Sequence, residues 1–440
     1  MDNLDLEALT TQQLELLLEQ KKAATTLIFA DINSTGQGLP TPANTDALLK
    51  FYNIRIRYNE MTKDTDIDIP GVYFSADTET NAKLEHIRGL ARTHRLNPSD
   101  LFGHITVVAN QHAYHPVREW IDTHVWDGQD RLQLYYNSIE LEHENPMKET
   151  MMRKWVLSLV AALYHPNFSC EGVLTLQSPQ GRGKTISIEN ILPAQYRSRW
   201  NKDAVVIDMR DKDSIFKALQ FWIAELGEVD ATFRKSDMEA LKGFITEKTD
   251  VLRPPYERKS NRYPRRTVFY ATVNQPEFLQ DVENRRFWVL AVKRFHSIAI
   301  DAAQFWAQIK HIYESIRDKI STPAQRELNN EYGWFMSPDE RQSMHVLQEF
   351  HRAADPIEQL LDKQVIVSTI KGLTGEWMNI TDILGRCGRL NPNKRDLNTG
   401  AEWLRSKGFQ TNGNKQFNVL LRVGDQPYQY SDNKKANFDH

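Results

Sequence analysis

GVLTLQSPQGRGKTISIENIL, residues 172–192, is the most informative stretch of this chain. A short apolar and β-branched run leads into a turn that contains Gly181 and Gly183, and then into Lys184, Thr185 and a helix-like segment. Strand, glycine-rich turn and helix in this order form the context in which the pattern G-x-x-x-x-G-K-[ST] binds phosphate. The stretch therefore predicts a phosphate-binding loop between a buried strand and a helix.

Each part of this loop has a chemical reason. Glycines let backbone N–H groups turn inward around phosphates, and a helix N-terminus adds about half a positive charge. Lys184 would pair with the β- and γ-phosphate oxygens, and the Thr185 hydroxyl would bind Mg²⁺. We therefore expect ATP and Mg²⁺ as cofactors, with the nucleotide held by Ser178, Pro179, Gln180, Gly181, Arg182, Gly183, Lys184 and Thr185.

Ser178 departs from the pattern, because a glycine usually stands at the first position of the loop. A serine is tolerated there if the backbone does not need a positive φ. The alternative is an ordinary glycine-rich turn from strand to helix.

Strand-like and helix-like segments alternate from about residue 166 to residue 300. FWIAEL (221–226) and TVFYATVN (267–274) are further apolar runs of strand length. Alternation of this kind is typical of an α/β fold with helices on a parallel sheet. We expect an α/β P-loop ATPase core, with an α-helical or α+β N-terminal region and a C-terminal winged-helix-like domain.

Acidic residues follow the strand at 221–226. The run FWIAELGEVD ends its apolar part at Glu225, and Glu228 stands three residues on. A nucleotide hydrolase needs a carboxylate at a strand end to hold the metal and polarise water. The alternative is a pair of solvated carboxylates in a helix turn.

Two later strand ends carry further polar candidates. TVFYATVNQ ends in Thr272 and Asn274, and an asparagine there can orient the attacking water, unless it only forms a turn. DVENRRFWVL places Arg285 and Arg286 before an apolar strand. In an ATPase one of them is a candidate finger that reaches the γ-phosphate of a neighbouring subunit.

The segment RPPYERKSNRYPRR, residues 253–266, is dense in basic residues and contains two tyrosines. A basic hairpin with aromatic residues suits binding to a nucleic-acid backbone and stacking on bases, whereas the alternative is a solvated charged loop. The candidate DNA-binding residues are Arg253, Tyr256, Arg258, Lys259 and Arg262.

The order of these features is similar to that of the superfamily 3 helicases, a branch of the AAA+ ATPases. FWIAELGEVDATFRKSDMEALKGFITEKTDVLRPPYERK, NRRFWVL and the upstream HPVREWIDTHVWDGQDRL resemble, more closely, the virulence-associated protein E family of phages and mobile elements. The resemblance covers roughly residues 110–300. The chain departs from the pattern at Leu226, which follows Glu225 directly, so the two acids are not adjacent.

The resemblance implies a role for each candidate. Lys184 and Thr185 would be the Walker A residues, and Glu225, with Glu228, the Walker B acids. The departure leaves open which acid binds metal and which polarises water. Asn274 would be the sensor and Arg285, rather than Arg286, the finger. The hairpin tip around Arg258 and Lys259 would face the central pore of a ring, a hexamer.

The resemblance thus implies an ATP-dependent DNA helicase or replication initiator of a phage or mobile element. Single-stranded DNA would pass through the pore, and a primase or other replication proteins would be partners. The alternative is a non-enzymatic DNA-binding or partner-sequestering protein with a degenerate P-loop fold. The presence of Lys184, Thr185 and Glu225 favours the enzyme.

Five segments are expected along the chain. Residues 1–110 form an α+β region of unknown role, 111–165 a helical collar, 166–300 the ATPase core, 301–350 a helical connector and 351–430 the winged-helix-like domain. That last domain would bind duplex DNA through Arg386, Arg389, Lys394 and Arg395, or dock a protein. DTDIDIP (64–70) is expected to be a surface turn and not a metal site.

Composition narrows the class of protein. The 440 residues carry a formal net charge of −3, which argues against a uniformly basic coat protein for nucleic acid. Two cysteines, Cys170 and Cys387, exclude a disulfide framework and favour the cytoplasm. No apolar run approaches the roughly 20 residues that span a bilayer.

Overall fold

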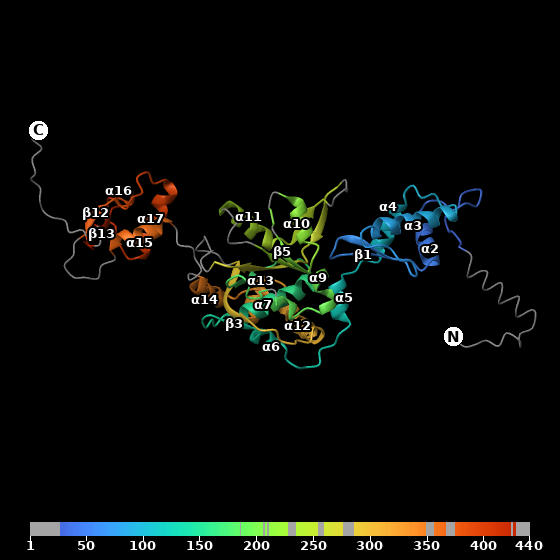
Figure 1. The fold of residues 1–440 in the computed structure, drawn as a ribbon, viewed down its shortest axis with the longest axis horizontal. Helices are drawn as coiled ribbons and strands as arrows, with labels where there is room; N and C mark the ends of the chain where they lie inside the picture. Colours follow the sequence, from blue (N-terminus) through green and yellow to red (C-terminus); the bar gives the residue numbers. More distant parts are fainter. Residues whose placement is uncertain are drawn as a thin grey trace, which may run out of the picture.

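The structure of the protein is a computed structural model. It describes residues 27–184, 186–205, 207–208, 211–227, 235–253, 259–275, 286–348, 356–366, 375–423 and 426–427. Figure 1 shows three packed bodies in chain order: an N-terminal unit, a central body built on a sheet, and a C-terminal module. No described helix is long and apolar enough to cross a membrane.

A six-stranded sheet organises the central body, and five of its strands run parallel. In spatial order the strands are β3 (Ile139–Leu141), β10 (Phe287–Phe295), β4 (Val173–Gln177), β9 (Val268–Val273), β6 (Ile223–Leu226) and β5 (Asn201–Val205). Only β3, at one edge, is antiparallel to its neighbour. The predicted α/β class with a mostly parallel sheet is therefore confirmed for this body.

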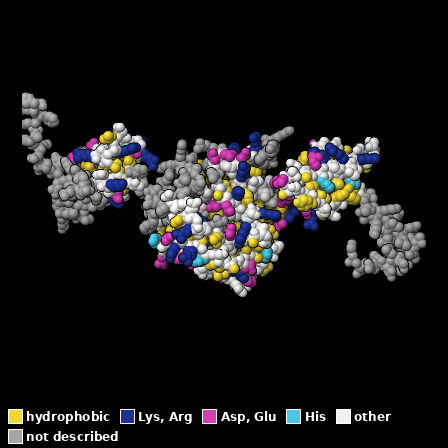
Figure 2. All heavy atoms as spheres, viewed as in Figure 1, with side chains coloured by type: hydrophobic (Ala, Val, Ile, Leu, Met, Phe, Trp, Pro, Cys, Tyr) yellow, Lys and Arg dark blue, Asp and Glu magenta, His cyan; other side chains and the backbone are white. Residues whose placement is uncertain are grey.

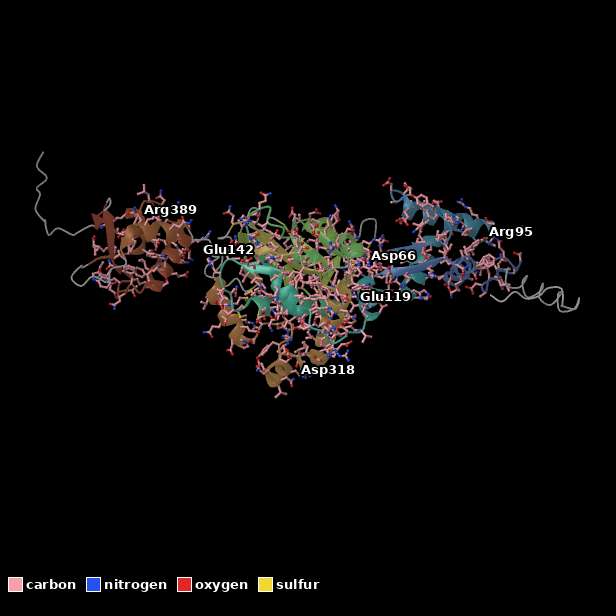
Figure 3. All side chains as sticks on the ribbon, turned by 60° about the horizontal axis from the view of Figure 1, so that its bottom comes forward. Asp66, Arg95, Glu119, Glu142, Asp318 and Arg389 are labelled. Carbon is pink, nitrogen blue, oxygen red and sulfur yellow. The ribbon has the colours of Figure 1, made fainter. Side chains whose placement is uncertain are left out.

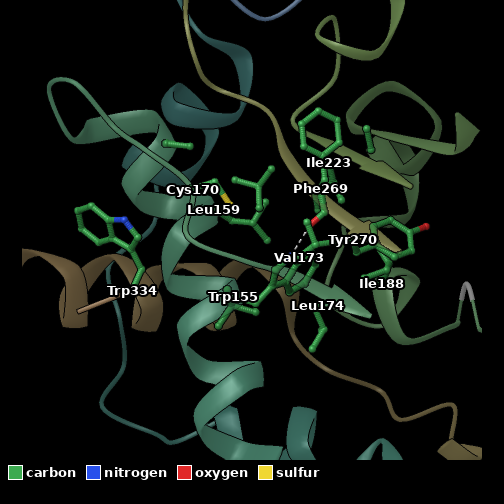
Figure 4. Packing of buried hydrophobic residues seen from close by; sticks show 14 of the residues in the cluster. Trp155, Leu159, Cys170, Val173, Leu174, Ile188, Ile223, Phe269, Tyr270 and Trp334 are labelled. Carbon is green, nitrogen blue, oxygen red and sulfur yellow. Dashed lines mark hydrogen bonds between the residues drawn. The ribbon is translucent and has the colours of Figure 1, made fainter. Parts of the chain in front are cut away.

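Buried tryptophans attach two helices to the core of this body. Trp155 of α7 (Lys148–Tyr164) donates its indole N–H to the carbonyl of Phe269 at 2.9 Å, as Figure 4 shows. Trp306 of α12 (Ala302–Ile316) donates to the carbonyl of Ile191 at 2.6 Å. Each indole is fully buried and still satisfies its polar atom, which is the condition for burying tryptophan without cost.

The remaining elements of the central body surround this core. They are α5 (Pro116–Asp122), α6 (Leu132–Asn137), α8 (Ile186–Glu189), η2 (Ala194–Tyr196), α9 (Arg197–Trp200), α10 (Lys212–Ala218), α11 (Lys235–Thr246), β7 (Thr249–Leu252), β8 (Asn261–Pro264), η3 (Arg317–Lys319), α13 (Pro323–Asn329) and α14 (Pro338–Gln348). Strands β7 and β8 pair antiparallel, so the basic hairpin predicted from the sequence is formed.

The N-terminal unit packs three helices against a two-stranded sheet. Its elements are α2 (Pro42–Phe51), β1 (Arg55–Asn59), β2 (Asp64–Asp68), α3 (Glu79–Thr93) and α4 (Leu101–Gln111). The expectation of a turn at DTDIDIP is wrong, because residues 64–68 form β2. Asp66 accepts hydrogen bonds from Asn59 and from the Tyr114 hydroxyl, which holds its carboxylate in place.

The turn between β1 and β2, residues 60–63, joins this unit to the central body. The Glu60 carboxylate accepts a hydrogen bond from Arg266 at 3.1 Å. The Lys63 ammonium donates to the backbone carbonyl of Leu219, and burial lowers the pKa of Lys63 to about 7. Figure 3 places Asp66 and Glu119 at the same junction. The N-terminal unit is therefore in contact with the segment before β6 and with the base of the hairpin.

The C-terminal module has a hydrophobic core of its own. It contains α15 (Pro356–Gln364), β11 (Val365–Ile366), β12 (Glu376–Met378), α16 (Ile380–Arg386), α17 (Lys394–Ser406), β13 (Phe417–Val423) and β14 (Gln426–Pro427). Asn379 caps α16, because its side chain accepts a hydrogen bond from the N–H of Asp382 at 2.8 Å.

A buried ion pair fixes the base of the hairpin. The Arg265 side chain is fully buried and donates two hydrogen bonds to the Asp250 carboxylate, at 2.7 and 2.5 Å. It also donates to the carbonyl of Phe244, at the end of α11. A two-pronged contact between planar groups sets both distance and orientation, so β7, β8 and α11 are locked to one another.

We expect Asp250→Ala to destabilise the protein by about 3–5 kcal/mol, because it leaves a buried guanidinium without its counter-charge. Chemical denaturation of the wild type and the variant measures the loss. Glu140→Ala is the control, since it breaks an exposed ion pair with Lys293 that water screens. Equal losses in the two variants would contradict the role given to the buried pair.

Candidate functional site

The loop after β4 has the backbone that its sequence predicts. Gly181 and Gly183 lie in the left-handed region, with φ of 80° and 78°. A Cβ at Gly183 would lie 2.8 Å from the Cδ1 atom of Ile186, so this position needs glycine for space as well as conformation. Ser178, in the described part of the chain, does not have a positive φ. Its N–H donates to the carbonyl of Val273 at 3.1 Å.

The serine at position 178 therefore continues the sheet instead of starting the turn. It is buried, and its hydrogen bond extends the pairing of β4 with β9 by one residue. Position 178 therefore does not need the conformational freedom of a glycine.

Lys184 and Asn274 come together at the carboxyl ends of β4 and β9. The Lys184 ammonium donates to the Asn274 Oδ1 atom at 2.6 Å and to the carbonyl of Val273 at 3.1 Å. Two residues that are 90 positions apart in sequence are thus in contact where β4 and β9 end. Crevices outside the carboxyl ends of parallel strands are where α/β sheets bind ligands.

Glu225 lies next to this edge, inside the sheet, and is only 8% exposed. Its Oε1 atom accepts from the Thr272 hydroxyl at 2.5 Å, and its Oε2 atom accepts from the N–H of Ala204 at 3.0 Å. In the register of the sheet Glu225 pairs with Tyr270, three residues before Val273. Thr272 therefore links the carboxylate to the edge.

Tyr270 and Asp203 complete this network, and the sequence reasoning missed both. The buried Tyr270 hydroxyl lies 3.4 Å from Glu225 Oε2 and 3.5 Å from Asp203 Oδ1. Burial, and then the charges of Glu225 and Asp203, raise the pKa of Tyr270 well above its ordinary value, so the phenol keeps its proton at neutral pH. Alternation along β9 puts Tyr270 and Thr272 on one face, a signal that could have found the tyrosine.

A backbone irregularity aims the donor of Ala204 at Glu225. Strand β5 changes register between Lys202 and Val205, and Ala204 has φ of 49°, which is unusual for alanine. A Cβ at Gly227 would lie 3.2 Å from the Ala204 Cα atom. The sequence carries no signal for this bulge.

Arg286 lies at the opposite end of the sheet, where the parallel strands begin. It precedes β10, whose first residue pairs with Val173 at the start of β4, and parallel strands begin at the edge away from the loop. Its guanidinium donates to the carbonyl of Glu171 at 3.2 Å. Within one chain, Arg286 is therefore not brought to Lys184, Asn274 or Glu225.

On the basic hairpin, three of the candidate DNA-binding residues are accessible to solvent. Arg253, Lys259 and Arg262 are exposed. Tyr263, in contrast, is buried and packs edge-on against Phe216 at 6.4 Å between ring centroids. A stacking role for Tyr263 is therefore excluded, although the basic side chains can reach a ligand.

Several predicted site residues lie outside the described residues: Thr185, Glu228, Tyr256, Arg258 and Arg285. The described residues contain no cluster of three or more His, Cys, Asp or Glu side chains that could hold a metal. Mg²⁺ needs fewer, because it retains waters and takes one or two carboxylates and substrate phosphates. The Glu225 carboxylate and the neighbouring Thr272 hydroxyl are oxygen groups of the kind that such an ion prefers.

Comparison with known proteins finds a family match in the central body. Residues 121–337 match the model of the virulence-associated protein E-like domain. The resemblance noted from the sequence is thereby confirmed for this segment. No curated protein matches the chain.

Solved structures that are similar to the chain include two of the NrS-1 C-terminal region. The A form apo structure is 12% identical, with a TM-score of 0.40 over 73% of this chain and 78% of that one. The apo structure of residues 305–718 is 12% identical, with a TM-score of 0.38 over 86% and 98% of the two chains. At these values the likeness carries no argument about fold or activity.

The contact between Lys184 and Asn274 predicts in which direction substitutions of Asn274 change the affinity for nucleotide. If Lys184 must leave Asn274 to bind phosphate, Asn274→Ala removes a competing partner, and affinity for Mg-ADP rises about 3- to 10-fold. Such a change, about 0.7–1.4 kcal/mol, lies within the range of the net contribution of a typical hydrogen bond. Asn274→Asp gives Lys184 a stronger partner and lowers the affinity. Isothermal titration with ADP measures both, because ADP lacks the γ-phosphate that a sensor residue would contact.

Asn190→Ala is the matched control, since its side-chain amide donates to the carbonyl of His296 instead. A lower affinity for ADP in both Asn274 variants would contradict the competition between asparagine and phosphate.

Proposed function

Because residues 121–337 form a virulence-associated protein E-like domain, we propose that this protein is an ATP-dependent DNA helicase or replication initiator of a phage or mobile genetic element. The contact of Lys184 with Asn274 at 2.6 Å is the observation that carries the proposal. It joins the glycine-rich loop and the end of a neighbouring strand, which are the two parts that a γ-phosphate would have to meet. The proposed core is a P-loop ATPase of the AAA+ type, similar to superfamily 3 helicases.

The order of the strands supports this core. The strand with the loop, β4, is flanked by β10 and β9, and β6 with Glu225 follows β9. All four strands are parallel, so their carboxyl ends lie at the same end of the sheet. Lys184, Asn274 and the end of β6 therefore contribute to the same edge, at which ATP is proposed to bind.

Each residue has a proposed task in hydrolysis. Backbone N–H groups of residues 180–185 and the Lys184 ammonium bind the phosphates, and Asn274 orients the attacking water. One of Glu225 and Glu228 takes part in binding Mg²⁺ with Thr185, and the other accepts the proton of the water. The ion, when bound, neutralises charge on the phosphates. Glu225 is already oriented for either task by Thr272 and by the N–H of Ala204.

The finger is proposed to come from another subunit. Arg286 precedes β10 at the amino-terminal end of the parallel strands, away from the loop, and Arg285 is its neighbour in sequence. An arginine at this end of the sheet can reach a γ-phosphate only if this end of one copy faces the glycine-rich loop of the next copy. Arg286 is bonded to the carbonyl of Glu171, which leaves Arg285 as the proposed finger. A closed ring, proposed to be a hexamer, satisfies this geometry for every copy.

The hairpin is proposed to grip single-stranded DNA in the pore of the ring. Arg253, Lys259 and Arg262 are exposed on it, and its base is fixed by the buried Arg265–Asp250 pair. Cationic side chains on a rigid support bind a phosphate backbone without reading its sequence. Tyr256 and Arg258 at the tip would add a stacking surface and a further charge.

A non-enzymatic protein that binds DNA or sequesters a partner is the second candidate. In such a protein the loop would be only a structural turn, and the hydrogen bond from Lys184 to Asn274 would be permanent. Nucleotide binding separates the two candidates, because only the ATPase requires Lys184 to move.

Complementation between two inactive variants tests the ATPase and its finger together. Lys184→Ala removes the phosphate ligand and Arg285→Ala the finger, so each variant alone should lose ATPase activity by about 100-fold or more. A mixture should regain part of it, because a neighbouring Lys184→Ala copy supplies Arg285 to an intact site. ATPase assays on mixtures from 1:9 to 9:1 measure the gain. An inactive wild type would overturn the enzyme, and an inactive mixture would overturn the finger in trans.

Glutamine variants assign the two acids. The variant of the metal-binding glutamate should require more Mg²⁺ for half-maximal activity. The variant of the water-polarising glutamate should keep its Mg²⁺ dependence and lose about 100-fold or more in kcat. Glu225→Gln and Glu228→Gln are compared in Mg²⁺ titrations of the ATPase. Identical behaviour of both variants would contradict the division of roles.

The double variant Lys259→Ala/Arg262→Ala should weaken binding to an oligo-dT strand. Removal of two phosphate-binding charges lowers the salt dependence of log K by about 1.4, at roughly 0.7 per phosphate for single strands. Fluorescence anisotropy over a salt series measures it. Arg317→Ala/Lys319→Ala removes the same charge from an exposed site distant in sequence and is the control. An unchanged salt slope in the hairpin variant would defeat the assignment.

A further inference from the structure

Helix α17 packs against the core of the C-terminal module through one face. Trp403 and Leu404 are buried in that core. Gly400 allows a close approach of α16, since a Cβ there would lie 2.9 Å from the Cδ1 atom of Ile380. This orientation leaves the opposite face of α17 in solvent.

The exposed face of α17 is basic and polar. Its members are Lys394, Arg395, Asn398, Glu402 and Arg405, all exposed. Successive members are spaced so that they fall on one side of a helix of 3.6 residues per turn. The face thus carries three cations, one carboxylate and one amide, and none of these five side chains is apolar.

Two other cations that the sequence singled out serve the module itself. Arg386 donates to the Glu376 carboxylate at 2.7 Å, which links α16 to β12. Arg389 donates to Asp396 at 2.8 Å, and Asp396 belongs to the capping box at the start of α17. Figure 3 shows Arg389 on this module. Of the four predicted DNA contacts, Lys394 and Arg395 are the ones that lie on the exposed face.

A turn next to α17 extends the basic surface. Residues 412–416 lie between Thr411 and Phe417, which form a β-bridge. Lys415, in this turn, is exposed and has φ of 58°. The Arg405 guanidinium lies 5.8 Å from the centre of the Phe417 ring, so the strand that leaves the turn passes beside the helix face. Figure 2 shows Lys and Arg side chains at the edges of this module.

We propose that the exposed face of α17, together with the turn at residues 412–416, binds duplex DNA. The major groove is about 12 Å wide and admits one α-helix. Lys394, Arg395 and Arg405 would contact phosphates on both sides of the groove, and Lys415 would contact the backbone beside it. Asn398, in the middle of the face, has the amide that pairs with an adenine edge.

The composition of the face selects DNA over a protein partner. The centre of a protein–protein interface is enriched in aromatic residues, Met and Arg and depleted in Lys and Glu. The face of α17 contains Lys394 and Glu402 and no aromatic or Met side chain, so only its two arginines match such an interface. The proposed ligand also differs from that of the hairpin, since a single strand offers no groove that would accommodate a helix. The full chain would therefore hold two DNA sites of different kinds.

Duplex binding by the full-length protein tests the proposal. The probe is a fluorescent 20-base-pair duplex, with excess unlabelled oligo-dT present to occupy the hairpin. In Arg395→Ala/Arg405→Ala the affinity should fall about 10-fold or more at 0.1 M salt. The salt slope should decrease by about two, at roughly 0.9 for each phosphate that the variant no longer neutralises. Arg395→Lys/Arg405→Lys keeps the charges and should retain most of the slope.

Lys363→Ala/Lys407→Ala is the matched control, because it removes two exposed lysines of the same module from outside this face. Thermal unfolding confirms that each variant is folded. An unchanged duplex affinity in the arginine-to-alanine variant, or an equal loss in the control, overturns the proposal. Unchanged duplex binding with altered self-association in sedimentation would overturn it too and assign the face to a protein contact. The proposal stands independently of hydrolysis, since a chain without ATPase activity could still bind duplex through α17.

Discussion

The parallel pairing of β4 with β9 is the constraint on which the site depends. Gln177 lies opposite Val273, so both strands end at the same level and the segments that follow share one edge. The hydrogen bond from Ser178 to the carbonyl of Val273 prolongs this pairing to the first residue of the loop. Lys184 reaches Asn274 only because the two strands are adjacent and in this register. A shift by one residue would turn every side chain of one strand to the other face.

The local features of the site could be predicted from sequence, and its spatial partners could not. Strand, glycine turn and helix lie within about 20 residues, so residues 172–192 contain all the information on the loop. Asn274 was identified for the same reason, because it directly follows an apolar run. The order of the strands is a property of long-range packing, and no local pattern showed that β9 would lie between β4 and β6.

The surroundings of Glu225 could not be predicted from the sequence around it. The carboxylate was predicted from its place at the end of an apolar run, but three of the groups around it come from two other strands. Tyr270 and Thr272 belong to β9, and the N–H of Ala204 comes from a bulge in β5. Backbone outliers at a polar, buried spot are a recognised mark of functional sites. Ala204 is such an outlier, and its N–H is directed at the one acid that the sequence placed in the sheet.

Arg265 and Arg266 limit how the hairpin can move. The first side chain is bonded to Asp250 inside the central body, and the second is bonded to Glu60 of the N-terminal unit. Breaking a buried pair by moving one partner costs several kcal/mol, so the base of the hairpin moves only together with β7 and α11. If the hairpin moves DNA as proposed, either the segment between Leu252 and Asn261 or whole subunits would have to move. Since Glu60 attaches the N-terminal unit at the same point, motion of whole subunits would carry that unit along with the hairpin.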